Sequence, residues 1–238
     1  MTTPALRFHQ VVKRYAGTPV LDGVDLEIRP GECVGLAGIN GAGKTSLIKC
    51  LFDVVALDGG SIDIYGLAHR RPAARGPLVF LPERFQPPYH QTGARFLDTM
   101  MRLHGRRPER HLVERECEQL GLPPEALSKP VRQHSKGTSQ KLGLAACFLS
   151  GKATYVLDEP MSGLDPQARV LFKARLQRAR AEGATVFFSS HLLADVEELC
   201  DRMAILHGGR MRYVGTPGAC RELHAAATLE QAFMKVIH

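Results

Sequence analysis

The sequence lacks any run of about 18 consecutive apolar residues, the length that a membrane-spanning helix requires. Charged residues near the N-terminus also interrupt the apolar segment that a secretory signal would need. The six cysteines are spread along the chain and include no C-x-x-C pair, so the sequence indicates neither a zinc site nor a disulfide framework. We therefore expect a reduced cytosolic protein with ordinary core cysteines, which would act at a membrane only through a partner.

Glycine and proline, at 23 and 15 of 238 residues, are too scarce for a low-complexity or collagen-like chain. The apolar share of 44% and the charged share of 23% are typical of a globular protein that can bury a sizeable core. Lysine and arginine number 31 and aspartate and glutamate 24, which gives a formal net charge of +7. This charge is compatible with nucleic acid, a nucleotide or an anionic membrane surface as the partner, and it selects none of them.

Strand-like and helix-like segments alternate in the first and last thirds of the chain, which predicts a mostly parallel, doubly wound α/β sheet. We expect strands over 6–12, 24–28, 32–37, 61–65, 78–81, 154–157, 185–189, 204–206 and 211–214. We expect helices over 45–52, 167–181, 192–199 and 229–237 in the same parts of the chain, and over 94–103, 109–120 and 139–149 in the middle. No internal repeat is visible. We therefore expect a single domain over 1–238, with a core formed by 1–85 and 151–238 and a helical subdomain inserted at 86–150.

A glycine-rich loop lies between the strand expected over 32–37 and the helix that follows it. The loop reads G-I-N-G-A-G-K-T, a complete G-x-x-x-x-G-K-[ST] phosphate-binding motif in its proper strand–loop–helix context. Its glycines let backbone N–H groups turn toward phosphates, and the helix adds the positive end of its dipole. We expect Lys44 to reach the β- and γ-phosphates and the Thr45 hydroxyl to ligate Mg²⁺. The residues predicted to bind the nucleotide in this loop are Gly38, Asn40, Gly41, Ala42, Gly43, Lys44, Thr45 and Ser46.

Two carboxylates end the apolar strand Y-V-L-D-E. Asp158, at the strand terminus, is expected to hold Mg²⁺ through its water shell. Glu159, one residue later, is placed to polarise a water for in-line attack on the γ-phosphate. An acidic cap before a helix would have the same sequence, but the phosphate loop in the same chain favours the nucleotide site.

Three further motifs resemble those of ATP-binding cassette (ABC) ATPases. Ser135-Lys136-Gly137-Thr138-Ser139-Gln140 resembles the signature motif of that family, Ser162-Gly163-Leu164-Asp165 resembles its D-loop, and Ser189-Ser190-His191 resembles its switch histidine. The order of the five motifs matches the family over about residues 5–215, which is a highly specific match. The resemblance implies a RecA-like P-loop core with an N-terminal antiparallel β-lobe and an inserted α-helical subdomain.

The family resemblance also implies that two cassettes pair head to tail around two ATP molecules. Ser135, Lys136, Gly137 and Thr138 would then contact the ATP bound by the other subunit, since they precede a helix whose N-terminus attracts anions. The Ser135 hydroxyl could equally serve as a plain helix cap. Asp165 would couple the two sites at the dimer interface, cap the helix that begins at Pro166, or do both.

Several side chains complete the site that the resemblance implies. His191 would contact the γ-phosphate and hold the attacking water. Tyr15 would stack on adenine, although a half-buried surface tyrosine has the same sequence context. Glu83 stands where the family usually has a glutamine that ligates Mg²⁺ and water; a carboxylate can take this place, and Gln86 is the alternative.

The sequence is therefore interpreted as an ATP-binding and ATP-hydrolysing subunit that dimerises on ATP and energises a separate polytopic permease. Its partner cassette would be a second copy or a paralogue. We expect the chain at the cytoplasmic face of the inner membrane, and we expect it to bind no nucleic acid. The motifs look most like those of bacterial exporter ATPases. The alternative is a soluble ABC ATPase switch that acts on nucleic acid or the ribosome, which the positive charge leaves open. The arginines at 70–71, 75, 102, 106–107 and 110 are interpreted as solvated faces, with contact to lipid headgroups or a permease loop as the alternative.

Overall fold

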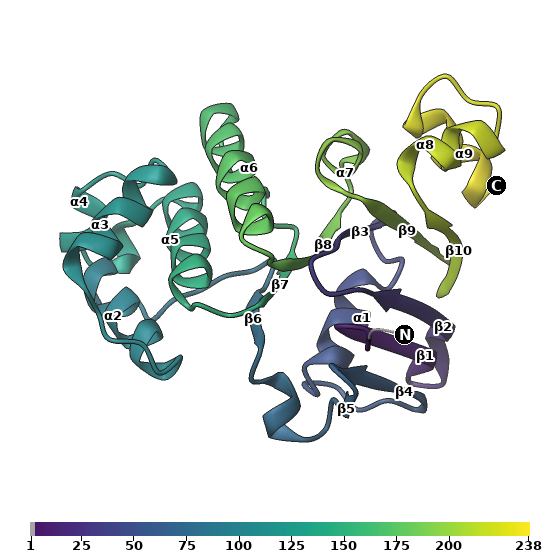
Figure 1. Ribbon diagram of the computed structural model, residues 1–238, viewed down its shortest axis with the longest axis horizontal. Helices are drawn as coiled ribbons and strands as arrows, with labels where there is room; N and C mark the ends of the chain where they lie inside the picture. The colour runs from purple at the N-terminus through teal and green to yellow at the C-terminus, as the bar shows by residue number, and fades with distance from the viewer. Residues whose placement is uncertain (1–2) are drawn as a thin grey trace.

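The computed structural model describes residues 3–238 and contains two sheets with helices around them (Figure 1). The central sheet has the strand order β10-β9-β3-β8-β7-β6, and all of its neighbouring strands pair in parallel except β10 and β9. Its strands are β3 (Cys33–Ala37), β6 (Leu78–Leu81), β7 (Thr154–Asp158), β8 (Thr185–Ser190), β9 (Arg202–His207) and β10 (Arg210–Gly215). The parallel α/β core predicted from the alternation of strands and helices is confirmed.

An antiparallel sheet forms from the N-terminal part of the chain, as the family resemblance implied. It contains β1 (Leu6–Tyr15), β2 (Thr18–Ile28), β4 (Gly59–Ile64) and β5 (Leu67–Ala68), in the order β2-β1-β4-β5. The prediction ended β1 at residue 12, but the strand runs on to Tyr15. The pairing with β2 shifts register between Phe8 and Val11, where Gln10 adopts a positive φ of 47°. A bulge of this kind breaks the alternation on which the prediction depended.

Helices between β6 and β7 form a group apart from the two sheets, at the left of Figure 1. They are α2 (Gly93–Leu103), α3 (Arg110–Gln119), α4 (Glu125–Ser128) and α5 (Lys136–Leu149), with a 3-10 turn at Val131–Gln133. The sequence predicted that the last of these four helices, α5, starts at residue 139, and this prediction was wrong. Ser135 caps α5, so the first turn begins at Lys136.

The remaining helices are α1 (Lys44–Leu51), α6 (Pro166–Ala181), α7 (Leu193–Leu199), α8 (Pro217–Leu223) and α9 (Leu229–Ile237), with a 3-10 turn at Pro72–Arg75. α4, α8, β5 and the 3-10 turns were not predicted from the sequence, and all of them are short. Within residues 3–238, no helix combines the length and the apolar character needed to cross a membrane.

The central sheet separates two apolar clusters. Phe187 faces the cluster that contains α1 and the antiparallel sheet, where its ring centroid lies 5.9 Å from that of Phe8. Phe188, the next residue of β8, faces the cluster that contains α5, α6, α7 and α9. Successive residues of a strand point to opposite faces, so β8 is buried on both sides. Because β8 pairs in parallel with both β3 and β7, the carboxyl ends of the three strands lie together at one edge of the sheet.

Candidate active site

A cavity of about 350 Å³ lies at the carboxyl edge of the central sheet. Residues 40–46 of the glycine-rich loop line one side of it, and Glu83, Glu159, Ser162 and His191 line the rest, together with Val20. The structure therefore brings together the loop, Glu159 as the second of the two carboxylates at the strand end, and His191, as predicted. Gly38 and Asp158 lie next to the cavity without lining it. The predicted signature residues, Asp165 and Tyr15 are not among its lining residues.

The loop requires glycine where the chain passes close to other backbone. A Cβ atom on Gly38 would lie 2.6 Å from the carbonyl oxygen of Leu206, and one on Gly43 would lie 2.9 Å from that of Val20. Gly43 also precedes α1 with a φ of 106°, in the left-handed region that glycine enters most readily. These contacts bring the N-terminus of α1 to the cavity, where its free N–H groups can bind a phosphate.

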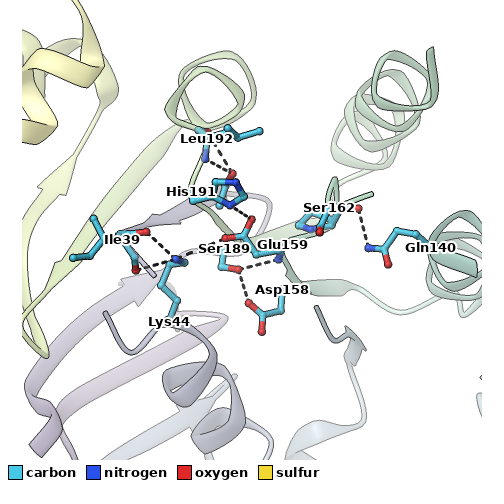
Figure 2. Close-up of polar contacts among 12 residues, drawn as sticks. Ile39, Lys44, Gln140, Asp158, Glu159, Ser162, Ser189, His191 and Leu192 are labelled. Carbon is cyan, nitrogen blue, oxygen red and sulfur yellow. Dashed lines mark hydrogen bonds and ion pairs between the residues drawn. The ribbon is translucent and has the colours of Figure 1, made fainter. Parts of the chain in front are cut away.

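Lys44 lines the cavity and brings the positive charge of the loop to it; Figure 2 shows its contacts. Its Nζ donates a hydrogen bond to the carbonyl oxygen of Gly38 at 2.7 Å and lies 3.7 Å from Oε1 of Glu159. The side chain is 8% exposed, so the ammonium group is largely removed from water. A partly desolvated cation at a helix N-terminus favours a polyanionic ligand such as the phosphates of ATP.

Asp158 meets the chemical requirements for holding Mg²⁺. It is 1% exposed, and its Oδ1 accepts a hydrogen bond from the Ser189 hydroxyl at 2.5 Å. Its Oδ2 is buried and has no hydrogen-bond partner. A buried carboxylate oxygen without a partner is costly unless a ligand supplies one, and Mg²⁺ with its waters prefers oxygen ligands. Thr45 and Glu83, the other two ligands proposed from the sequence, line the cavity, and all three residues offer the oxygen donors that Mg²⁺ prefers.

Glu159 turns into the cavity at the end of β7. Its φ of 48° lies in the left-handed region, which costs about 1–3 kcal/mol for a residue other than glycine. Its backbone N–H donates to Oγ of Ser189 at 2.9 Å, and its Oε2 lies 2.8 Å from Nδ1 of His191. The carboxylate is thus fixed between an imidazole and the Lys44 ammonium, where it can accept a proton from a bound water.

The signature residues lie at the N-terminus of α5, outside the cavity. Oγ of Ser135 accepts the backbone N–H of Thr138 at 3.1 Å, which is the helix-capping alternative. Lys136 donates from Nζ to the hydroxyl of Ser162 at 3.3 Å, and a Cβ on Gly137 would lie 2.9 Å from the carbonyl oxygen of Gly163. The signature and the D-loop therefore pack against each other within one chain.

Asp165 caps α6, as one of its two predicted alternatives stated. Its Oδ1 accepts the backbone N–H of Ala168 at 2.8 Å. This hydrogen bond lowers the pKa of the Asp165 carboxyl. The side chain is 60% exposed and so remains accessible to a partner surface.

Of the two candidates for the magnesium and water ligand, Glu83 lines the cavity and Gln86 does not. Tyr15 is 43% exposed at the end of β1, with the Nζ of Lys13 5.4 Å from its ring centroid. The residue is thus partly exposed, with the Lys13 ammonium over its ring. The exposure equally fits the alternative of a partly buried surface tyrosine.

Ser162 and Ser189 are site residues to which the sequence analysis gave no role. Both lie inside quoted motifs, but their contacts depend on the tertiary structure. Ser162 lines the cavity and accepts a hydrogen bond from Lys136, while Ser189 contacts both Asp158 and Glu159. No sequence signal separates Ser189 from the serine beside it.

Comparisons with known proteins identify the family of the chain. The family profile described as ABC transporter matches residues 21–162. The chain is 35% identical to the Nod factor export ATP-binding protein I of Burkholderia pseudomallei, over 91% of this chain and 72% of that protein. It is 36% identical to an uncharacterised ABC transporter ATP-binding protein of Synechocystis, over 81% of this chain and 55% of that protein.

Two solved structures share the fold. The ATP-binding subunit of an ABC transporter superposes with a TM-score of 0.86 at 29% identity, covering 98% of this chain and 99% of that one. A bacterial Atm1-family ABC exporter with ATP bound superposes with a TM-score of 0.83 at 19% identity, covering 100% of this chain and 43% of that one. The second match concerns the fold alone. With its RecA-like P-loop fold and the site described above, the chain belongs to the ABC transporter family as one of its ATP-binding, ATP-hydrolysing subunits.

Proposed function

We propose that the chain dimerises around ATP and drives export through a separate polytopic permease, at the cytoplasmic face of the inner membrane. The observation that carries this proposal is the cavity in which Lys44, Glu159 and His191 meet. The name of the 35% identical relative, which is an export protein, supports the direction of transport. The partner cassette would be a second copy or a paralogue. No nucleic acid is required.

Each site residue has a proposed role in hydrolysis. The loop residues, Lys44 and Ser46 bind the phosphates, and Tyr15 stacks on adenine. Glu159 takes the proton of the attacking water, and His191 holds that water and the γ-phosphate in line. Thr45, Asp158 and Glu83 would hold Mg²⁺, which neutralises phosphate charge when bound.

The dimer would complete each site from the other subunit. A capped helix N-terminus would face the γ-phosphate of the partner's ATP, through the signature residues Ser135, Lys136, Gly137 and Thr138. Asp165 would lie at the interface. This arrangement accounts for a signature motif that lies outside its own chain's cavity.

The helical region would link ATP to the permease. We propose that residues 86–150 form a subdomain, with 1–85 and 151–238 as the core. Glu83 lines the cavity, and the chain runs on from it into α2, so the stretch 83–104 joins the γ-phosphate position to the helices. We place the docking site of the permease there.

The test is an affinity pull-down of the tagged chain from detergent-solubilised membranes, with and without ATP. Recovery of a polytopic membrane protein is the expected result. Recovery of only soluble or nucleic-acid partners, with ATPase activity intact, would instead favour a non-transport ATPase switch. Salt-sensitive binding to nucleic acid would strengthen that alternative.

A further inference from the structure

Ser189 lies opposite Asp158 in the parallel pair β7–β8, although 31 residues separate them in the chain. Ser189 is 0% exposed and Asp158 is 1% exposed. The hydroxyl is therefore out of contact with solvent, and its hydrogen bonds are made within the protein.

A single oxygen of Ser189 contacts both acidic residues of the site (Figure 2). Its hydroxyl donates to Oδ1 of Asp158 at 2.5 Å, and the same oxygen accepts the backbone N–H of Glu159 at 2.9 Å. The direction of each bond follows from chemistry, because an ionised carboxylate can only accept and a backbone N–H can only donate. A hydroxyl offers one donor and two acceptor positions, so one side chain can make both bonds.

These two bonds orient the two carboxylates differently. With Oδ1 of Asp158 occupied, Oδ2 is the oxygen left without a partner. The bond to the N–H of Glu159 fixes the residue whose φ is 48°, and so supports the turn that carries its carboxylate toward Lys44 and His191. Without the hydroxyl, Asp158 could rotate, and the Glu159 N–H would be left buried and unpaired.

We propose that Ser189 is a positioning residue that aims Asp158 at the metal and Glu159 at the attacking water with one hydroxyl group. The inference rests on the proposed roles of Asp158 and Glu159. Ser189 is fully buried and does not line the cavity, so it would act only through these two residues.

The first experiment compares Ser189→Ala with Thr185→Val. Thr185 lies in the same strand, is 1% exposed, and its hydroxyl accepts the backbone N–H of Gly31 at 2.9 Å. The control thus removes a buried β8 hydroxyl that touches no carboxylate. Supporting groups behind a metal site typically affect metal affinity or activity by about 10–100-fold. We expect Ser189→Ala to lower kcat by that factor and Thr185→Val to leave kcat unchanged. Equal kcat in the two variants, with both folded, would overturn the proposal.

The second experiment measures metal binding without turnover, in the Glu159→Gln background. Mn²⁺ is titrated in the presence of ATP and followed by electron paramagnetic resonance, and ATP affinity is measured separately in a chelator. We expect Ser189→Ala to weaken Mn²⁺ about tenfold with unchanged metal-free ATP affinity, and Ser189→Thr to restore Mn²⁺ binding. Unchanged Mn²⁺ affinity in Ser189→Ala would show that Ser189 does not orient Asp158 for metal binding.

The two proposals fail in different ways. If Glu159→Gln hydrolyses ATP like the unmodified protein, the assignment of the base under the proposed function is wrong. If Glu159→Gln is inactive while Ser189→Ala behaves like Thr185→Val, only the inference about Ser189 is wrong.

Discussion

Nδ1 of His191 lies 2.8 Å from Oε2 of Glu159, while Nζ of Lys44 lies 3.7 Å from the other carboxylate oxygen (Figure 2). The three side chains come from the ends of β8 and β7 and from the start of α1. One carboxylate thus joins the phosphate loop to the histidine across the cavity. A water bound between this carboxylate and a γ-phosphate would have its base already in place.

Glu159→Gln removes the base and keeps the shape of the side chain. We expect hydrolysis to slow by about 10²–10⁴-fold, because a neutral amide cannot accept the proton of the attacking water. ATP binding should persist, since the loop residues remain. Single-turnover hydrolysis and equilibrium ATP binding measure the two effects.

The matched control for that variant is Glu182→Gln, an exposed glutamate at the end of α6. It should leave both measurements unchanged. Near-normal turnover in Glu159→Gln would show that the proton is accepted elsewhere.

Tyr15→Ala tests the stacking of adenine. Stacking of a base on an aromatic ring is worth about 1–3 kcal/mol, so ATP affinity should fall by the corresponding factor. Tripolyphosphate has no base, and its affinity should be unchanged. Isothermal titration with both ligands gives the comparison.

Tyr89→Ala is the control for Tyr15→Ala, because Tyr89 is 58% exposed and does not line the cavity. Equal losses for ATP and tripolyphosphate in Tyr15→Ala would contradict stacking. Unchanged affinity for both ligands would leave Tyr15 as a surface tyrosine.

Glu116 of α3 and Arg175 of α6 form a buried ion pair that joins the helical region to the core, with 2.8 Å between Oε1 and Nε. Burial raises the pKa of the Glu116 carboxyl, against the opposing effect of the Arg175 guanidinium. A raised pKa in the folded state means that the native protein holds this proton more tightly than the unfolded chain. The contribution to stability is then full below the unfolded-state pKa and is lost as pH rises through the folded-state pKa.

The variant Glu116→Gln isolates this contribution, since glutamine does not titrate. The free energy of unfolding of the native protein, minus that of the variant, should fall as the pH rises from below the ordinary carboxyl pKa of 4.5 to well above it. Urea unfolding at several pH values measures it. A difference that rises with pH would mean that the Arg175 guanidinium lowers the pKa of Glu116 by more than burial raises it.

The phosphate loop and its helix could be predicted from the sequence because their chemistry is local. Glycines at fixed spacing, an apolar strand before them and a helical pattern after them are all contained within the stretch 32–52. The start of α5 was less well defined by the sequence. The capping alternative for Ser135 gives the observed start at Lys136, whereas the helical pattern placed the start at residue 139.

The role of Ser189 could not be predicted for a different reason. Its two partners lie 31 and 30 residues away, and only the register of β8 against β7 brings them together. A shift of that register by one residue would point Ser189 to the other face of the sheet.

α8 was missed although Thr216 and Pro217 form a readable start signal, because the helix is short and lies beyond the family motifs.

Gly137→Ala tests the contact between the signature and the D-loop. A methyl group at this position would lie 2.9 Å from the carbonyl oxygen of Gly163, a backbone atom that cannot move without the D-loop. The D-loop also carries Ser162, which lines the cavity, and leads to Asp165. The added methyl should therefore displace both surfaces that the proposed dimer brings to the interface.

We expect Gly137→Ala, in the Glu159→Gln background, to bind ATP as a monomer but to lose ATP-dependent dimerisation, measured by light scattering. Gly218→Ala is the matched control, because it lies at the start of α8 with nothing within 4 Å of the new Cβ. Its dimerisation should equal that of Glu159→Gln alone. A dimer of unchanged stability in Gly137→Ala would mean that the signature and the D-loop pack together for folding, and that the ATP-bound interface is built from other surfaces.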